Sequence, residues 1–288
     1  MSRRRTVPPS DSAAALRPVA EAREPLLAAC VVVAVLFAAM VLALVGADAW
    51  YLIRHGNGPA DLLRSLSRPG IRQAVVLSLT TSLCSLVLTL ATSLPLGYLL
   101  SRQRFPGRAL LSTLVDVPIV VPPVVIGISL LAFFGSGAGQ AVRAVLGRFG
   151  LSMVSGLGIV LCQYLVSVPY AIRAAAAAFD EVDRELEAVA MVLGCSRWRA
   201  FRGVTLPLAR HGLLAGGVMA WARALGVFGP IMAFVGTGPR VQVMPTCVWL
   251  ELSVGNIDVA LTLALVMLGL SGAALALVHA LAPGRSWT

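Results

Sequence analysis

The stretch DEVDRELEAVAMVLGCSRWRAFRGVTLP, residues 180–207, is a polar segment within an otherwise apolar chain. Asp180 or Asp183 can cap the N-terminus of a helix, and the glutamates that follow favour the positive end of its dipole. Four apolar residues then recur at helical spacing and predict one apolar stripe: Leu186, Val189, Ala190 and Leu193. The first half of the stretch is therefore expected to form a short amphipathic helix.

A glycine corner is predicted in the middle of this stretch. Gly194 follows the last apolar position of the stripe, where glycine adopts a left-handed C-cap that strains other residues. Ser196 can then cap a second short helix that carries Trp198 among several arginines, and Pro207 opens the next apolar segment. The stretch is thus expected to form a helix, a corner and a second helix on the protein surface.

The spacing of these residues resembles the EAA loop of permease subunits from ABC importers. In that family the loop is a cytoplasmic coupling helix that sits in a cleft of the ATPase subunit. The resemblance implies a role in ATPase coupling for six residues: Glu187, Ala188, Ala190, Gly194, Leu206 and Pro207. The glutamate and first alanine that name the motif are replaced here by Ala188 and Val189. The alternative is an amphipathic cytoplasmic loop of another kind of membrane protein.

The composition is that of a polytopic membrane protein. Of 288 residues, 58% are hydrophobic and 12% are charged, and the mean hydropathy of +0.87 lies outside the range of soluble proteins. A membrane-spanning helix needs about 20 mostly apolar residues, so the chain accommodates several spans and leaves no room for a soluble ATPase or binding domain. We therefore expect an all-α, polytopic helical membrane protein.

Six apolar runs predict about six transmembrane helices, near residues 25–45, 74–100, 109–134, 154–178, 208–235 and 259–281. The expected organisation is a disordered basic cytoplasmic tail over 1–24, a first transmembrane helix and external loop over 25–72, a permease domain over 73–281 with its coupling loop at 180–207, and a C-terminal tail over 282–288. The segments 135–150 and 236–258 are expected to be loops.

The charge distribution predicts which side of the membrane each loop occupies. All 23 basic residues are arginines, and the formal net charge is +10. The arginines lie mostly in short loops between apolar runs, which favours a topology signal over nucleic-acid binding. Six spans put both termini and residues 180–207 on the arginine-richer side, which is cytoplasmic by the positive-inside bias. We expect a multi-pass protein of the cell membrane, in contact with lipid and without a nucleic-acid partner.

Between Arg104 and Arg285 the chain resembles permeases of the molybdate, tungstate and sulfate import family. The stretches that carry the resemblance are FPG at 105–107, PIVVPPVVIG at 118–127, LEAVAMVLG at 186–194, ARALGVFGP at 222–230 and ELSVGN at 251–256. The resemblance implies the type I, MetI-like permease fold and an oxyanion solute, molybdate or tungstate or else sulfate. Val227 stands where the family often has a glutamate. Permeases for a polyamine, iron, thiamine or phosphate remain an alternative, because they share the coupling motif.

The same resemblance implies the partners. An extracytoplasmic solute-binding protein would deliver the solute, a dimer of ABC ATPase subunits would use ATP and Mg²⁺, and a second copy of this permease would complete a homodimer. This chain itself is expected to hold no cofactor, no metal and no catalytic residue. Its five cysteines lack CxxC spacing, and its three histidines are dispersed and lack an HExxH motif. An intramembrane enzyme is the more distant alternative.

Polar or helix-breaking residues within the apolar runs are candidates for lining the translocation pathway: Pro122, Pro123, Ser129, Gln163, Ser167 and Arg223. The two adjacent prolines break the backbone hydrogen-bond ladder, which at membrane depth is tolerated only where protein or water satisfies the freed groups. The alternative for these prolines is a kink in a packed helix. For the small polar residues the alternative is helix packing.

Arg223 lies within the fifth apolar run, where an arginine costs about 2.5–3.5 kcal/mol to insert. One interpretation is a positive charge on the route of a dianion, where the surroundings have a low dielectric constant. The other is a structural ion pair with Asp116, the acid inside the third apolar run.

Overall fold

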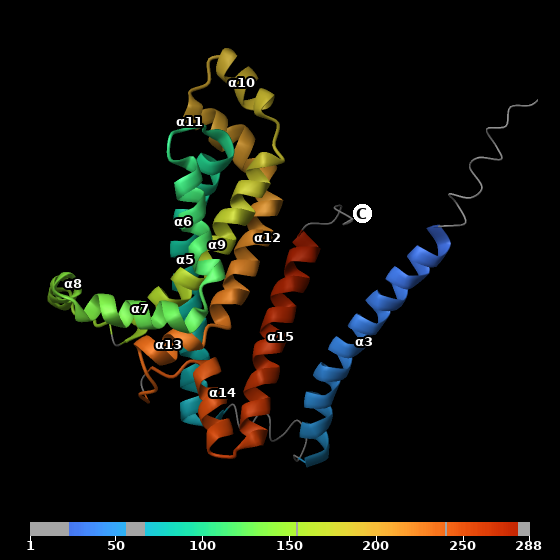
Figure 1. The fold of residues 1–288 in the computed structure, drawn as a ribbon, viewed down its shortest axis with the longest axis vertical. Coiled ribbons are helices and arrows are strands. Elements are labelled where there is room, and N and C mark those ends of the chain that lie inside the picture. Colours follow the sequence, from blue (N-terminus) through green and yellow to red (C-terminus); the bar gives the residue numbers. More distant parts are fainter. Residues whose placement is uncertain (1–22, 56–66, 154, 240, 282–288) are drawn as a thin grey trace, which may run out of the picture. The chain divides into compact units, whose positions relative to one another are not determined.

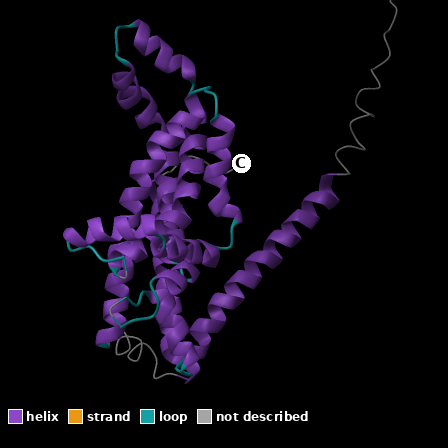
Figure 2. Ribbon diagram, turned by 60° about the vertical axis from the view of Figure 1, so that its left-hand side comes forward, coloured by secondary structure: helices purple, strands orange, loops and turns teal. Residues whose placement is uncertain are grey.

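The computed structural model describes residues 23–55, 67–153, 155–239 and 241–281. Within these ranges every regular element is a helix and no strand occurs, as the sequence predicts (Figure 2). The chain divides into two compact units, Met1–Gly56 and Asn57–Thr288. The tails predicted over 1–24 and 282–288 lie outside the described residues, apart from Arg23 and Glu24, which begin the first helix.

The first unit consists, in its described part, of one helix, α3 (Arg23–His55). Its segment Leu27–Asp48 is apolar and long enough to span a membrane, and none of it is buried within the chain. A helix that is apolar on all sides suits a lipid environment. The helix predicted for the first span is therefore confirmed.

Three long helices form the core of the second unit: α5 (Pro69–Arg102), α9 (Gly156–Asp180) and α12 (Leu206–Leu225). They run side by side through the unit (Figure 1). Small residues allow the close approach. A Cβ added to Gly97 of α5 would lie 2.6 Å from the Ala175 Cβ of α9, and one added to Gly216 of α12 would lie 2.4 Å from the Ala174 Cβ.

Hydroxyl groups of α5 also bond its neighbours. The Thr89 and Ser167 hydroxyls lie 3.2 Å apart and join α5 to α9. The Trp221 indole N–H of α12 donates to the Ser82 hydroxyl at 3.0 Å. In a membrane such bonds satisfy polar groups that lipid would leave unpaired, and they hold the three helices in register.

The third apolar run is not one helix but two, α6 (Arg108–Val120) and α7 (Pro123–Gly135), bent by 109°. Val121 and Pro122 between them are extended, because the residue before a proline is driven out of the helical region. Pro122 and Pro123 also have no N–H to continue the ladder. The predicted break at the prolines is confirmed, and the single helix expected over 109–134 is wrong.

The fifth predicted span, over 208–235, is also divided. α12 ends at Leu225, and α13 (Gly229–Phe234) follows with Pro230 in its first turn. Pro230 cannot donate to a continuing α12, but its fixed φ suits the start of a new helix. The single continuous helix expected over 208–235 is therefore wrong.

The two broken runs meet each other, since α13 packs against α7. A Cβ added to Gly127 would lie 2.6 Å from the Pro230 carbonyl oxygen. The rings of Phe134 and Phe234 have their centroids 5.5 Å apart. Nothing in the spacing of either run indicates this contact, because it joins residues about a hundred positions apart.

Two segments expected to be loops contain helices. α8 (Gly137–Arg148) begins where the Ser136 hydroxyl accepts the Gly139 N–H at 3.4 Å. α14 (Met244–Ser253) begins where the Thr246 hydroxyl accepts the Val243 N–H at 2.9 Å. These hydroxyls satisfy N–H groups that a helix start leaves open. The expectation of loops over 135–150 and 236–258 is corrected accordingly, and α15 (Ile257–Leu281) follows as the last helix.

By length and composition, the described residues contain four helices able to cross a membrane, or five if the bent pair α6 and α7 forms one span. The four lie in α3, α5, α9 and α15. α12 is not among them. The multi-pass character is confirmed, and the predicted number of about six exceeds this count.

Candidate functional site

Residues 180–207 form the helix, corner and helix that their sequence predicts, at one end of the second unit (Figure 1). α10 (Arg184–Val192) begins at Asp183, whose carboxylate accepts the Glu185 N–H at 2.9 Å. Glu185 and Glu187 lie in its first turn, at the positive end of the helix dipole. The start of the helix is thus set by local acids.

Gly194 makes the corner at the end of α10. Its φ of 89° lies in the left-handed region, and the Cys195 N–H bonds the Ala190 carbonyl at 3.0 Å, which closes the C-terminal cap. Ser196 then caps the second helix by accepting the Arg199 N–H at 3.4 Å. The predicted glycine corner and serine cap are both confirmed.

The second helix, α11 (Arg197–Ala200), runs through a π-helical turn (Phe201–Thr205) directly into α12. In this turn the Leu206 N–H bonds the Phe201 carbonyl five residues back. Pro207, which follows, has no N–H of its own. Helical spacing alone does not predict the π turn, and Pro207 is the residue that signals an irregularity there.

The apolar stripe of α10 is exposed. Leu186, Val189 and Leu193 are 46%, 56% and 79% exposed, and α10 has no buried residue. Val192 and Trp198 are 87% and 63% exposed. We call these five residues the elbow surface. Large apolar side chains exposed together, beside charged ones, mark a site of interaction with another protein or with a membrane.

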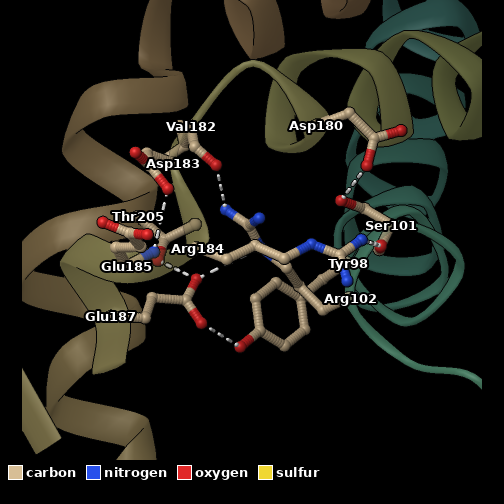
Figure 3. Close-up of polar contacts among 10 residues, drawn as sticks. All are labelled: Tyr98, Ser101, Arg102, Asp180, Val182, Asp183, Arg184, Glu185, Glu187 and Thr205. Carbon is tan, nitrogen blue, oxygen red and sulfur yellow. Dashed lines mark hydrogen bonds and ion pairs between the residues drawn. The ribbon is translucent and has the colours of Figure 1, made fainter. Parts of the chain in front are cut away.

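The Glu187 side chain, unlike the elbow surface, points toward Tyr98 of α5 (Figure 3). Its Oε2 accepts the Tyr98 hydroxyl at 3.1 Å, and the Thr205 hydroxyl donates to its Oε1. The Arg102 Nε lies 3.3 Å from the same Oε1, with side chains only 4% and 12% exposed for Arg102 and Glu187. Glu187 therefore ties α10 to the ends of α5 and α12.

A second group of bonds fixes the chain just before α10 (Figure 3). The Ser101 hydroxyl donates to the Asp180 carboxylate at 2.6 Å, and Arg102 Nη2 donates to the Val182 carbonyl at 2.7 Å. Arg184 reaches back and donates to the Ser101 carbonyl. Residues 180–207 are thus held at their base by the end of α5, and the elbow surface at their tip is exposed.

The six predicted coupling residues differ in exposure and in the contacts that they make. Ala188, Gly194 and Pro207 are exposed, and Ala190 and Leu206 are half-buried. Glu187 is the only one of the six whose side chain bonds Tyr98, Arg102 and Thr205. Sequence spacing gives no signal for its partners on α5 and in the π turn, because they lie on other elements.

The candidate pathway residues lie on three parts of the second unit. Pro122 and Pro123 are exposed at the bend between α6 and α7, and Ser129 is exposed on α7. Gln163 and Ser167 of α9 are both 1% exposed, and Ser167 takes part in the bond to α5 described above. For each of these residues, lining of the pathway stays a prediction.

The ion pair proposed between Arg223 and Asp116 is not formed. The Arg223 guanidinium lies over the Tyr170 ring, 5.6 Å from its centroid. Asp116 instead accepts from Arg173 Nε at 2.7 Å, because α6 packs on α9 and Asp116 meets an arginine of that helix. This alternative for Arg223 is therefore wrong, and the cation is exposed beside an aromatic ring.

Metal-ligating residues do not cluster in the described part of the chain: no group of three or more histidine, cysteine, aspartate or glutamate side chains there could hold a metal ion.

The chain matches the family described as "Binding-protein-dependent transport system inner membrane component" over residues 93–286. A probable molybdenum ABC transporter permease protein of Haloferax volcanii is 39% identical over 238 residues, which cover 81% of this chain and 85% of the relative. A molybdate/tungstate transport system permease protein of Thermococcus kodakarensis is 37% identical over 180 residues, covering 62% and 67%. A molybdenum transport system permease protein of Escherichia coli is 38% identical over 179 residues, covering 62% and 78%.

Two solved structures share the fold. A bacterial ABC transporter involved in the import of the acidic polysaccharide alginate has a TM-score of 0.69 at 19% identity, covering 90% of this chain and 96% of that chain. The MetNI methionine ABC transporter in an inward-facing conformation has a TM-score of 0.59 at 18% identity, covering 74% and 96%. The fold expected from the sequence, that of MetI-like permeases, is confirmed.

Proposed function

Because this chain belongs to the family of binding-protein-dependent transport system inner membrane components, we propose that it is the permease of an ABC importer for an oxyanion, molybdate or tungstate. Relatives at 37% to 39% identity that carry these names support the choice of solute. Sulfate is also a tetrahedral dianion, so it is the third anion to be tested as a solute.

The elbow surface supports the coupling role, and it is the single observation that carries the proposal. Leu193 and Val192 at the tip of α10 are exposed, while Glu187 at its base is nearly buried and paired. A surface that is apolar at its tip and rigid at its base can dock in a cleft of an ATPase subunit and transmit motion to α5 and α12. ATP and Mg²⁺ act in that separate subunit, and this chain does not itself catalyse a reaction.

The proposed assembly has three kinds of partner. An ATPase dimer holds the elbow surface, a second copy of this permease completes the pathway as a homodimer, and an extracytoplasmic binding protein delivers the oxyanion at the opposite end. Because ATP is cytoplasmic, the elbow surface and both termini face the cytoplasm in this arrangement. The arginine distribution supports the same orientation.

Reconstitution tests the proposal. The permease, its ATPase and its binding protein are placed in proteoliposomes, and uptake of radiolabelled molybdate is followed with and without ATP. ATP-dependent uptake that unlabelled tungstate suppresses, and that phosphate and polyamines leave unchanged, is the expected result. Uptake of a different solute class, or hydrolysis of any solute by the permease alone, would contradict the proposal.

A further inference from the structure

An ion pair inside the second unit has the geometry of an oxyanion site. Arg173 of α9 donates from Nε to Asp116 Oδ1 of α6 at 2.7 Å, and from Nη2 to Asp116 Oδ2. Nη2 also donates to the Ser112 hydroxyl at 2.7 Å and to the Ser112 carbonyl at 3.2 Å. A guanidinium fork binds a carboxylate and an edge of a tetrahedral oxyanion through the same two parallel bonds. Asp116 therefore occupies the place that such an edge would take.

The pair lies well inside its helices. Arg173 precedes the end of α9 at Asp180 by seven residues, and Asp116 follows the start of α6 at Arg108 by eight. At 1.5 Å per residue these separations are about 10 Å and about 12 Å. α9 is long and apolar enough to cross a membrane, and α6 passes this test together with α7. The charges therefore lie away from the ends of both helices.

The pair is nevertheless open on one side. The Arg173 and Asp116 side chains are 39% and 43% exposed in the single chain. Charged side chains at membrane depth face a water-filled cavity or another protein surface, because contact with lipid is costly. In the proposed homodimer, the open side of the pair therefore faces water or the second copy, which is where a shared pathway runs.

A second cation lies next to the pair along α9. Arg223 of α12 stacks over Tyr170, and Tyr170 precedes Arg173 by three residues, so both lie on the same face of α9. Arg223 is exposed, and the pair is partly exposed. One guanidinium group, that of Arg173, is thus neutralised by Asp116, and the other, that of Arg223, lies over the ring of Tyr170, one helical turn from Arg173 on α9.

We propose that Arg173 and Ser112 form a transient binding site for the transported oxyanion, and that the Asp116 carboxylate is an internal counter-ion which the oxyanion displaces. Arg223 over Tyr170 is the next positive position on the route. This inference rests on the proposed function, since it assigns the place where the solute of that transporter binds.

Competition from the Asp116 carboxylate keeps the affinity of the site for the oxyanion low. A dianion attracts Arg173 more strongly than the singly charged Asp116 does, but the nearby carboxylate repels it. A pathway site must bind weakly enough to release its ion. With no solute present, Asp116 neutralises Arg173 and spares the membrane interior an unpaired charge.

Cysteine protection tests the site in the complete complex. Ser112→Cys places a thiol beside Arg173, and a small anionic thiol reagent is applied to proteoliposomes that contain permease, ATPase and binding protein. Labelling at position 112 is read by mass spectrometry. We expect molybdate and sulfate to slow it. The matched control is Thr113→Cys, on the next residue of α6, whose hydroxyl bonds its own helix at the Ala109 carbonyl; there the anions should change nothing.

Two further variants separate an oxyanion site from a purely structural pair. Asp116→Asn removes the competing charge, so molybdate should protect position 112 at a concentration about tenfold lower. Arg173→Lys keeps the charge but loses the fork, so uptake should fall by about tenfold or more while the ATPase still copurifies with the permease. A structural pair predicts neither result.

The inference is overturned if molybdate leaves labelling at position 112 unchanged or slows positions 112 and 113 equally. It is also overturned if Asp116→Asn leaves the protective concentration unaltered, or if Arg173→Lys transports as the unmodified chain does. Uptake by the unmodified complex, measured in separate vesicles of the same kind, keeps the two proposals apart. If that uptake is present and protection is absent, only the site is refuted, whereas loss of uptake refutes the proposed function.

Discussion

The Arg102 Nε of α5 lies 3.3 Å from the Glu187 carboxylate of α10, and the two side chains are only 4% and 12% exposed. Glu187 also accepts hydrogen bonds from Tyr98 and Thr205. A displacement of α10 must therefore move the ends of α5 and α12 with it. In the proposed importer, this contact links the docked ATPase to the helices of the core.

Breaking the pair between Glu187 and Arg102 should uncouple ATP hydrolysis from transport. Glu187→Ala leaves the Arg102 guanidinium nearly buried without its carboxylate, and removal of one partner of a buried ion pair costs about 3–5 kcal/mol. We expect uptake to fall about tenfold or more while ATP hydrolysis continues, measured in the same proteoliposomes. The matched double variant Glu187→Met with Arg102→Met should recover stability, because no charge is left unpaired. If Glu187→Ala transports normally, the link is elsewhere.

A charge on the elbow surface should prevent docking. Leu193→Glu introduces a carboxylate at a position that is 79% exposed, so the permease should fold, but a charge buried in an apolar contact is unfavourable. Copurification of the ATPase with the permease should therefore be lost. The control is Val145→Glu on α8, which is 52% exposed and distant in sequence from the coupling stretch. Equal loss of ATPase in both variants would argue against a specific surface.

The corner at Gly194 should tolerate few other residues. Its φ is 89°, and a non-glycine residue there costs about 1–2 kcal/mol, more for a β-branched one. Gly194→Val should therefore reduce coupled uptake, and Gly194→Asn should reduce it less, since asparagine adopts this conformation more readily. Gly203→Ala is the control, because its added Cβ meets nothing within 4 Å and its φ is not in the left-handed region. Equal uptake by Gly194→Val and Gly203→Ala would show that the corner geometry is not needed.

One added methyl group should destabilise the contact between α7 and α13. A Cβ on Gly127 would lie 2.6 Å from the Pro230 carbonyl oxygen and 2.7 Å from its Cα, so the backbone of α7 or α13 must shift. Overpacking of this kind costs about 1–3 kcal/mol. We expect Gly127→Ala to lower the thermal stability of the purified permease, and Gly135→Ala on the same helix, where nothing lies within 4 Å, to leave it unchanged.

The local features of the coupling stretch could be predicted from its sequence, because each depends on neighbouring residues. An aspartate cap, a stripe at helical spacing, a glycine corner and a serine cap are all properties of short segments. The break at Pro122 and Pro123 was predictable for the same reason. Its angle of 109° was not, because the direction of α7 is set by its packing on α13.

Contacts between residues far apart in the chain could not be predicted from the sequence. Arg102 pairs with Glu187 across 85 positions, and Asp116 pairs with Arg173 and not with Arg223. Hydropathy places Asp116 and both arginines inside apolar runs but does not say which helices are neighbours. The choice of partner followed from the packing of α6 on α9.

Side-specific labelling of Cys195 tests the central claim most directly. Cys195 follows Gly194 at the corner and is partly exposed, and a Cys195→Ser chain identifies its signal among the five cysteines. A membrane-impermeant thiol reagent should label Cys195 in inverted vesicles and not in intact cells, and bound ATPase should suppress the labelling. Labelling from outside intact cells, or full labelling with the ATPase bound, would contradict a cytoplasmic elbow surface that couples this permease to ATP hydrolysis.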